Sequence, residues 1–155
     1  MTLPKQPHAT DAEKRPSIHA SLVLRGFTNS PSELSAILGL TPRRTGRPGE
    51  PYLAGGRTPT GRVIKEAYWA LGSDLDHRAA LEDHIGSIVE RTRSARQALK
   101  TLPPNVRAVV SCTVIPNGDL PLFVLDSALL SSLAELRCSL ELDIVSVEAD
   151  VEETD

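Results

Sequence analysis

The sequence predicts an α+β domain, and two patterns along the chain support this fold class. Short segments in which apolar and polar residues alternate, as in half-buried strands, recur between residues 17 and 147. Between them lie segments whose apolar residues recur at spacings of three and four, as in amphipathic helices. We therefore expect an open mixed or antiparallel sheet of at least four strands with helices packed mainly on one face.

The chain has 155 residues, which fits one domain with additional segments at its ends. Residues 1–16 are polar, contain three prolines and show no periodicity, so we predict a disordered N-terminal tail there. The single domain is expected to cover residues 17–148. Residues 149–155 are rich in Asp and Glu and are predicted to form an acidic C-terminal tail.

The first part of the domain predicts a strand followed by a short helix. Apolar residues alternate with polar ones over residues 17–25. Ser30 is a candidate N-cap, Pro31 stands at the first helical position and Glu33 completes a capping box. These signals predict a helix over residues 31–38.

The middle of the chain predicts a long connection, a strand and the longest helix. Residues 41–62 contain four prolines and five glycines, a composition typical of irregular structure with short strand pairing. Trp69 lies in an alternating segment on the same side as its apolar neighbours, which predicts a core position, with a stacking wall beside the arginine-rich segment as the alternative. One long helix is expected over residues 75–101, with Ser73 or Asp74 as its N-cap.

The last third of the domain repeats the order strand, helix, strand. Strands are predicted over residues 106–114 and 140–144, and a helix capped by Asp126 over residues 127–137. The two halves share this pattern and no recognisable sequence. We therefore predict a ferredoxin-like fold with pseudo-duplicated halves.

Three stretches, taken in order, resemble a bacterial family. They are residues 32–51, residues 68–71 with 81–85, and residues 133–136 with 140–144. On these residues the chain resembles the family called domain of unknown function 4279 over about residues 18–147. The resemblance implies a compact cytoplasmic protein of this fold class and assigns no reaction. The family's occasional mention beside toxin–immunity systems implies an immunity-like role.

The amino-acid composition argues against several classes of protein. Hydrophobic residues make up 40% and charged residues 24% of the chain, which argues against a disordered polymer and a membrane protein. The chain has no apolar signal-peptide core, and its two cysteines argue against a disulfide scaffold, so we expect a cytoplasmic location. A net charge of −3 and an aromatic content of 3% argue against nucleic acid as a partner.

The candidate binding residues are the arginines of residues 41–62. They are Arg43, Arg44, Arg47, Arg57 and Arg62. Since Glu50 is the single acid there, this segment has a net charge of +4, whereas the rest of the chain has −7. Arginine forks bind carboxylates and phosphates in pairs of hydrogen bonds. A solvated segment whose arginines pair with the domain's carboxylates is the competing interpretation.

Three functions are compatible with this charge pattern. The first is a non-catalytic protein-interaction module that meets an acidic partner, with a homo-oligomer as a variant. The alternative is a binder of a phosphate-bearing small ligand or RNA at the same loop. The third is an enzyme of unrecognised type, which the sequence disfavours because it contains none of the common catalytic motifs.

No catalytic, metal-binding or cofactor-binding residue is predicted. His77 and His84 are expected on one face of the long helix, two turns apart, which is too far for one metal ion. Cys112 is expected to fill the core. Cys138 is expected at a helix C-terminus, which raises the pKa of a thiol and disfavours a nucleophile.

Overall fold

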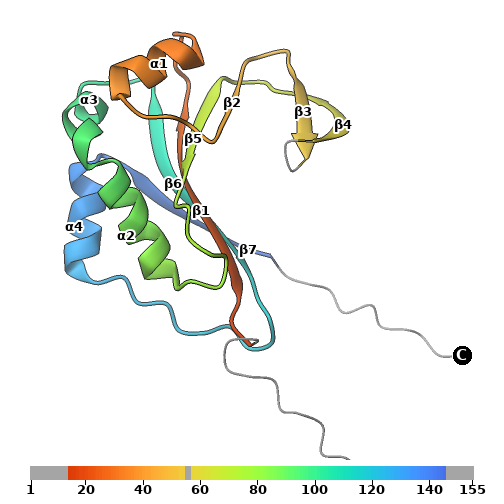
Figure 1. Ribbon diagram of the computed structural model, residues 1–155, viewed down its shortest axis with the longest axis vertical. Coiled ribbons are helices and arrows are strands. Elements are labelled where there is room, and N and C mark those ends of the chain that lie inside the picture. The colour runs from red at the N-terminus through yellow and green to blue at the C-terminus, as the bar shows by residue number, and fades with distance from the viewer. Residues whose placement is uncertain (1–13, 55–56, 146–155) are drawn as a thin grey trace, which may run out of the picture.

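A five-stranded mixed sheet forms the centre of the protein, in the order β2-β5-β1-β6-β7 (Figure 1). Neighbouring strands are antiparallel, except that β6 and β7 are parallel. The computed structural model describes residues 14–54 and 57–145. The strands of this sheet are β1 (Ser17–Arg25), β2 (Arg44–Gly46), β5 (Tyr68–Gly72), β6 (Arg107–Ile115) and β7 (Ser139–Ile144).

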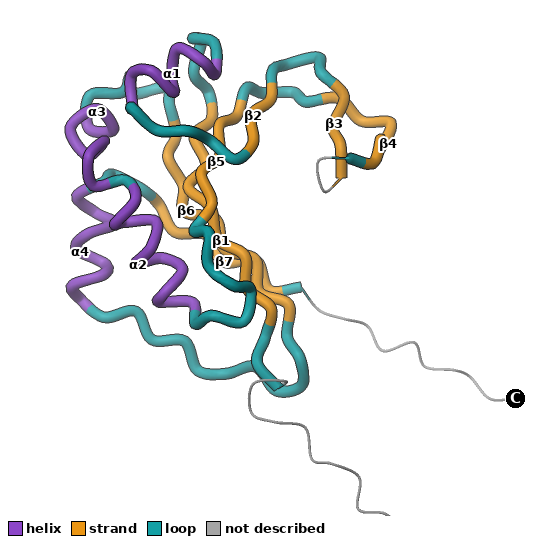
Figure 2. The backbone as a smooth tube through the Cα atoms, in the orientation of Figure 1, coloured by secondary structure: helices purple, strands orange, loops and turns teal. Residues whose placement is uncertain are grey.

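The helices cover one face of the sheet, and a separate hairpin stands over the other face (Figures 1 and 2). The helices are α1 (Pro31–Leu38), α2 (Leu81–Arg91), α3 (Arg96–Lys100) and α4 (Ser127–Glu135), with the 3-10 turn η1 (Arg93–Ala95) between α2 and α3. The hairpin is built from β3 (Pro51–Ala54) and β4 (Thr58–Val63), whose described residues form a two-stranded sheet separate from the central one. The sheet therefore has one helix-covered face and one open face.

Strand periodicity places the core between the sheet and the helices. The side chains of Leu22 and Leu24 in β1 are buried, whereas Ser21 and Val23 on the open face are partly exposed. Trp69 is 0% exposed, and its indole Nε1 donates a hydrogen bond to Ser35 Oγ of α1 at 2.9 Å. The predicted core position of Trp69 is therefore confirmed.

Helix α1 begins and ends at the predicted residues. Ser30 and Glu33 cap each other's backbone N–H groups, and the hydrogen bond from Glu33 N to Ser30 Oγ measures 3.2 Å. Gly39 follows in the left-handed region with φ 65°, a conformation that ends helices and favours glycine. In α4, Asp126 Oδ1 accepts the Leu129 N–H at 2.8 Å, as predicted, and the helix is two residues shorter than expected.

The prediction of one helix over residues 75–101 is wrong. Helix α2 begins only at Leu81, and the chain leaves α-helical geometry at Thr92 before η1 and α3. The Thr92 hydroxyl donates to the Ile88 carbonyl at 2.7 Å, so this side chain competes with the backbone for the helical hydrogen-bonding pattern. The apolar periodicity continues across the break because all three segments pack on the same side of the sheet.

Ser73 and Asp74 do not cap α2, in contrast to the sequence prediction. The N-cap residue is Ala80, which has no capping side chain. Ser73 Oγ instead hydrogen-bonds Nδ1 of His84, and Asp74 has φ 58° and pairs with Arg91 at 3.1 Å. Both residues therefore hold the connection from β5 to α2 in place by side-chain contacts with α2, and not by capping the helix.

The predicted α+β class and sheet are confirmed, but the ferredoxin-like order and the duplicated halves are not. In the second half, α4 connects the adjacent parallel strands β6 and β7. In the first half, α1 connects β1 to β2, which run parallel with the antiparallel strand β5 between them. The two strand–helix–strand units therefore differ in topology.

The predicted C-terminal tail (149–155) and residues 1–13 of the predicted N-terminal tail lie outside the described residues. Within the described part of the chain, every helix is too short or too polar to cross a bilayer.

Candidate anion-binding groove

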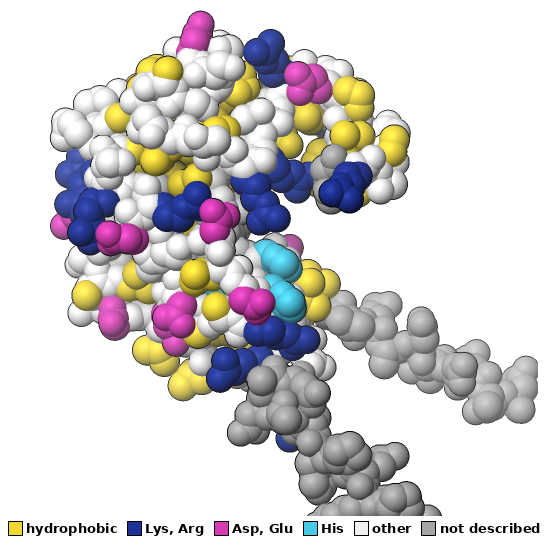
Figure 3. Space-filling model, viewed as in Figure 1, with side chains coloured by type: hydrophobic (Ala, Val, Ile, Leu, Met, Phe, Trp, Pro, Cys, Tyr) yellow, Lys and Arg dark blue, Asp and Glu magenta, His cyan; other side chains and the backbone are white. Residues whose placement is uncertain are grey.

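A groove lies between the open face of the sheet and the β3–β4 hairpin (Figure 3). Its volume is about 560 Å³. Strands β1, β5 and β6 form the floor, and the hairpin with residues 64–66 forms the wall. In Figure 3 the surface is hollowed below the hairpin, and Lys and Arg side chains gather at this hollow.

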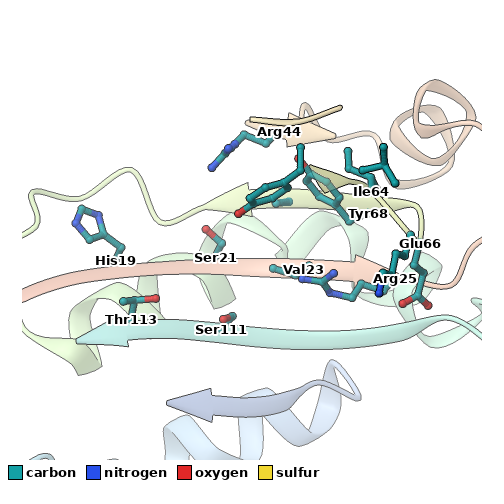
Figure 4. Close-up of a pocket in the computed structure, with 14 residues that line it drawn as sticks. His19, Ser21, Val23, Arg25, Arg44, Ile64, Glu66, Tyr68, Ser111 and Thr113 are labelled. Atoms are coloured by element: carbon teal, nitrogen blue, oxygen red, sulfur yellow. The ribbon is translucent and has the colours of Figure 1, made fainter. Parts of the chain in front are cut away.

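The floor of the groove has small polar side chains at its centre. Ser21 of β1 lies directly opposite Ser111 of β6, and Thr113 follows Ser111 on the same face (Figure 4). Ala70 of β5 lies opposite Val23 of β1 and also lines the groove. Short side chains on adjacent strands leave room for a ligand to approach the sheet. The floor of the groove is therefore low at its centre because the strand register brings short side chains together there.

Three cationic side chains line the groove, and they are Arg25, Arg44 and Lys65. Arg44 Nη2 donates to the Leu53 carbonyl at 3.2 Å, which joins β2 to the hairpin. Among the described residues, Arg25 and Lys65 form no ion pair or hydrogen bond through their side chains. These two cations are therefore available to an incoming anion.

Among the described residues that line the groove, Glu66 is the one acidic residue. Both of its carboxylate oxygens accept from Arg107 Nη2, at 2.7 and 2.6 Å. This ion pair neutralises the carboxylate, so the groove keeps an excess of positive charge.

The groove also contains the two tyrosines of the chain, Tyr52 from β3 and Tyr68 from β5. The ring of Tyr68 packs against Gly46 of β2, where a Cβ atom would lie only 2.4 Å from Tyr68 Cε1. Glycine is therefore required at this position to let the ring lie over the edge of the sheet. Neither phenol hydroxyl has a hydrogen-bond partner among the residues that the structure describes.

The five arginines predicted as binding residues do not all reach the groove. Arg44 lines it, whereas Arg47 lines a neighbouring cavity beside the loop after β1. Arg43 lies against Gly72, at 3.5 Å from the place of a Cβ atom there. Arg57 and Arg62 are exposed on the hairpin. Whether any of the five binds a partner stays a prediction.

Sequence reasoning missed Arg25, Lys65 and both tyrosines. Arg25 occupies the open-face register of β1, and this signal was present in the alternation of residues 17–25. The wall residues carry no comparable signal, because their place depends on how the hairpin folds back over the sheet.

His19, His77 and His84 are the histidines that the structure describes. His77 precedes α2, so the prediction that it shares a helix face with His84 is wrong; its ring instead stacks on His19, with centroids 6.2 Å apart. His84 is buried, and its burial lowers the pKa below the ordinary value of 6.5, with a further lowering by His19. Within residues 14–54 and 57–145, no group of His, Cys, Asp and Glu side chains is arranged to hold a metal ion.

Both thiols are poor nucleophiles. Cys112 is buried in the core, as predicted, and burial raises the pKa of its thiol to about 11. Cys138 follows α4, and burial likewise raises its thiol pKa to about 11. The predicted direction for Cys138 is confirmed, with desolvation as the cause.

Comparison with models of known protein families identifies one match for this chain. The model for the Domain of unknown function (DUF4279) matches residues 16–146. The chain belongs to this family. The match covers the whole sheet, the helices and the groove of the DUF4279 domain. Searches of curated proteins and of solved structures found no match to this DUF4279 chain.

Proposed function

We propose that this DUF4279 protein is a non-catalytic binding module that holds a phosphate-bearing ligand in the groove. The observation that carries the proposal is the set of three cations, Arg25, Arg44 and Lys65, around a groove whose acid is already paired. Phosphate oxygens accept charge-assisted hydrogen bonds from such side chains, and arginine binds them in a bidentate manner.

The size of the groove supports a small ligand. Its volume of about 560 Å³ lies within the range that small-molecule sites occupy. Its lining combines a few charged groups with the apolar side chains of Val23, Val63 and Ile64.

The absence of an activated nucleophile supports binding without chemistry. Ser21, Ser111 and Thr113 supply hydroxyls to the groove. Among the described residues, none of these hydroxyls hydrogen-bonds to His19 or to a carboxylate, so no base is placed to remove a proton. The family match assigns no reaction either.

Calorimetric titration with inorganic phosphate and pyrophosphate tests this proposal. We expect both anions to bind, pyrophosphate more tightly, and binding to weaken as salt is raised from low to physiological concentration. Arg25→Gln and Lys65→Gln should each weaken binding. Arg62→Gln is the matched control because Arg62 belongs to the hairpin but does not line the groove. Equal losses in all three variants, or no binding by the wild type, would refute the proposal.

An acidic protein partner is the second candidate, and the exposure of the hairpin favours it. All the described residues of β4 are exposed, and Val63 is 59% exposed. A two-stranded hairpin alone is marginally stable, so a partner that covers it would stabilise it. Arg57 and Arg62 would then face the acidic partner, which could also be a second copy of the chain.

Capture from the native cell extract, repeated with the double variant Arg57→Glu and Arg62→Glu, tests this candidate. Loss of one defined partner in the charge-reversed protein supports it. A wild type that retains no partner and remains monomeric at micromolar concentration contradicts it.

A further inference from the structure

Both tyrosines of the chain line the same groove, although 16 positions separate Tyr52 from Tyr68. The other aromatic side chains lie elsewhere, since Trp69 and Phe27 are buried and Phe123 is part of a different cavity. The groove therefore holds both tyrosine rings together with the side chains of Arg25 and Lys65, which are unpaired within the described part of the chain. The cationic side chains are sufficient to bind inorganic phosphate. The two tyrosines in the same groove therefore suggest that the ligand also has a part that contacts aromatic rings.

Strand register places a ring and a cation next to each other. Tyr68 of β5 lies directly opposite Arg25 of β1, and the same row begins with Gly46 of β2. Residues that are opposite on one face have Cβ atoms about 5 Å apart. The Tyr68 ring packs over Gly46, where a Cβ atom would lie 2.4 Å from Tyr68 Cε1, and its position on the strand is opposite Arg25.

Hydroxyl side chains lie two rows further along the floor, beyond Val23 and Ala70. Ser21 stands four residues before Arg25 on β1, on the same face, and lies opposite Ser111. Arg44 reaches over this floor from β2 (Figure 4). The groove thus offers, in order along β1, the hydroxyls of Ser21 and Ser111, the apolar side chain of Val23, and then Arg25, which lies opposite Tyr68.

We propose that the ligand is a nucleoside phosphate, whose base stacks on Tyr68 or Tyr52 and whose phosphate binds Arg25, Arg44 and Lys65. This inference rests on the proposed function and specifies its ligand class. A planar base is attracted to an aromatic face whatever its hydrogen-bonding pattern, and stacking strengthens binding several-fold or more. The paired Glu66 offers no free carboxylate to repel the phosphate.

Four probes separate the contribution of the ring from that of the phosphate, and they are adenosine 5′-monophosphate, ribose 5-phosphate, adenosine and inorganic phosphate. We expect calorimetry to show that adenosine 5′-monophosphate binds roughly tenfold more tightly than ribose 5-phosphate. Adenosine alone should bind most weakly because it lacks the anion. Arg25→Gln should weaken binding of both phosphate compounds and leave their ratio unchanged.

Tyrosine variants test the stacking directly. Tyr52→Leu and Tyr68→Leu together should abolish the tenfold preference and keep the affinity for ribose 5-phosphate, whereas Tyr68→Phe, which keeps the ring, should keep the preference. Circular dichroism establishes that each variant is folded, and Tyr52→Leu alone serves if Tyr68→Leu unfolds, because Tyr52 is 45% exposed.

The outcomes distinguish the two proposals. Equal affinities for adenosine 5′-monophosphate and ribose 5-phosphate would overturn the nucleotide inference and leave the phosphate site standing. No binding of any phosphate compound would overturn both. A short RNA that binds more tightly than the mononucleotide, with a dependence on the same tyrosines, would replace the mononucleotide by RNA as the ligand.

Discussion

The Ser73 hydroxyl lies 2.6 Å from Nδ1 of His84, and both side chains are buried. This hydrogen bond connects the end of β5 to the first turn of α2. The Ser87 hydroxyl donates to the Ser73 carbonyl at 2.6 Å and adds a second connection to the same helix. The helix layer is thus held to the sheet by polar contacts as well as by the apolar core.

His84 makes the stability of the protein dependent on pH. Burial lowers the pKa of its imidazole below 6.5, so the unfolded chain binds a proton more readily than the folded one. The contribution to the free energy of unfolding is therefore fully present above pH 6.5 and is lost as the pH falls below that value.

Urea unfolding between about pH 8 and about pH 5 measures this effect. We expect the free energy of unfolding to fall with decreasing pH more steeply in the wild type than in His84→Gln. His77→Gln is the control, because His77 is exposed and should keep the steep dependence. Parallel profiles for the wild type and His84→Gln would contradict the role of His84.

Trp69→Ala should destabilise the protein by roughly 3–5 kcal/mol, the usual cost of a large cavity in a core. The variant also leaves Ser35 without the indole donor that it accepts in the wild type. Tyr52→Ala is the control and should change stability by less than about 0.5 kcal/mol, because Tyr52 is exposed. Denaturant melts with equal midpoints for wild type and Trp69→Ala would exclude the core assignment.

Two glycine substitutions should have opposite effects. Gly46→Ala places a methyl group 2.4 Å from Tyr68 Cε1 and 2.6 Å from Ile64 Cδ1, and we expect a loss of roughly 1–3 kcal/mol from overpacking. Gly86→Ala in α2 meets no atom within 4 Å and should gain about 0.5–1 kcal/mol from helix propensity. Thermal melts of both variants check the signs. Stabilisation by Gly46→Ala would show that the Tyr68 ring is free to move.

Glu66→Gln should tighten binding of phosphate roughly threefold, because the change leaves the Arg107 guanidinium without its carboxylate partner and so raises the net positive charge next to the groove. The free energy of unfolding should change by less than about 1 kcal/mol, since the lost ion pair is largely exposed. Glu90→Gln removes a comparable surface pair with Arg93, outside the groove, and should not alter phosphate binding. Calorimetry that finds weaker binding in Glu66→Gln would argue against an anionic ligand.

Local signals in the sequence determined much of the fold. Ser30, Pro31 and Glu33 specify the start of α1 through contacts within one turn, and Gly39 specifies its end. The alternation around Trp69 specifies which side of β5 faces the core, since side-chain direction has a period of two residues. The break at Thr92 escaped this reasoning because a threonine hydroxyl competes with the backbone without changing the apolar period.

Only the tertiary structure decided the candidate site. The charge of residues 41–62 drew attention to five arginines, and the fold brings Arg44 of this set into the groove beside Arg25 and Lys65. Those neighbours come from other segments, and they meet because β5 pairs with both β1 and β2 while the hairpin folds over the open face. Strand order and register are properties of distant pairings, which no local pattern encodes. The sequence by itself therefore determined helices α1 and α4 and the core side of β1, β5 and β6. The pairing of distant strands determined where a ligand could bind.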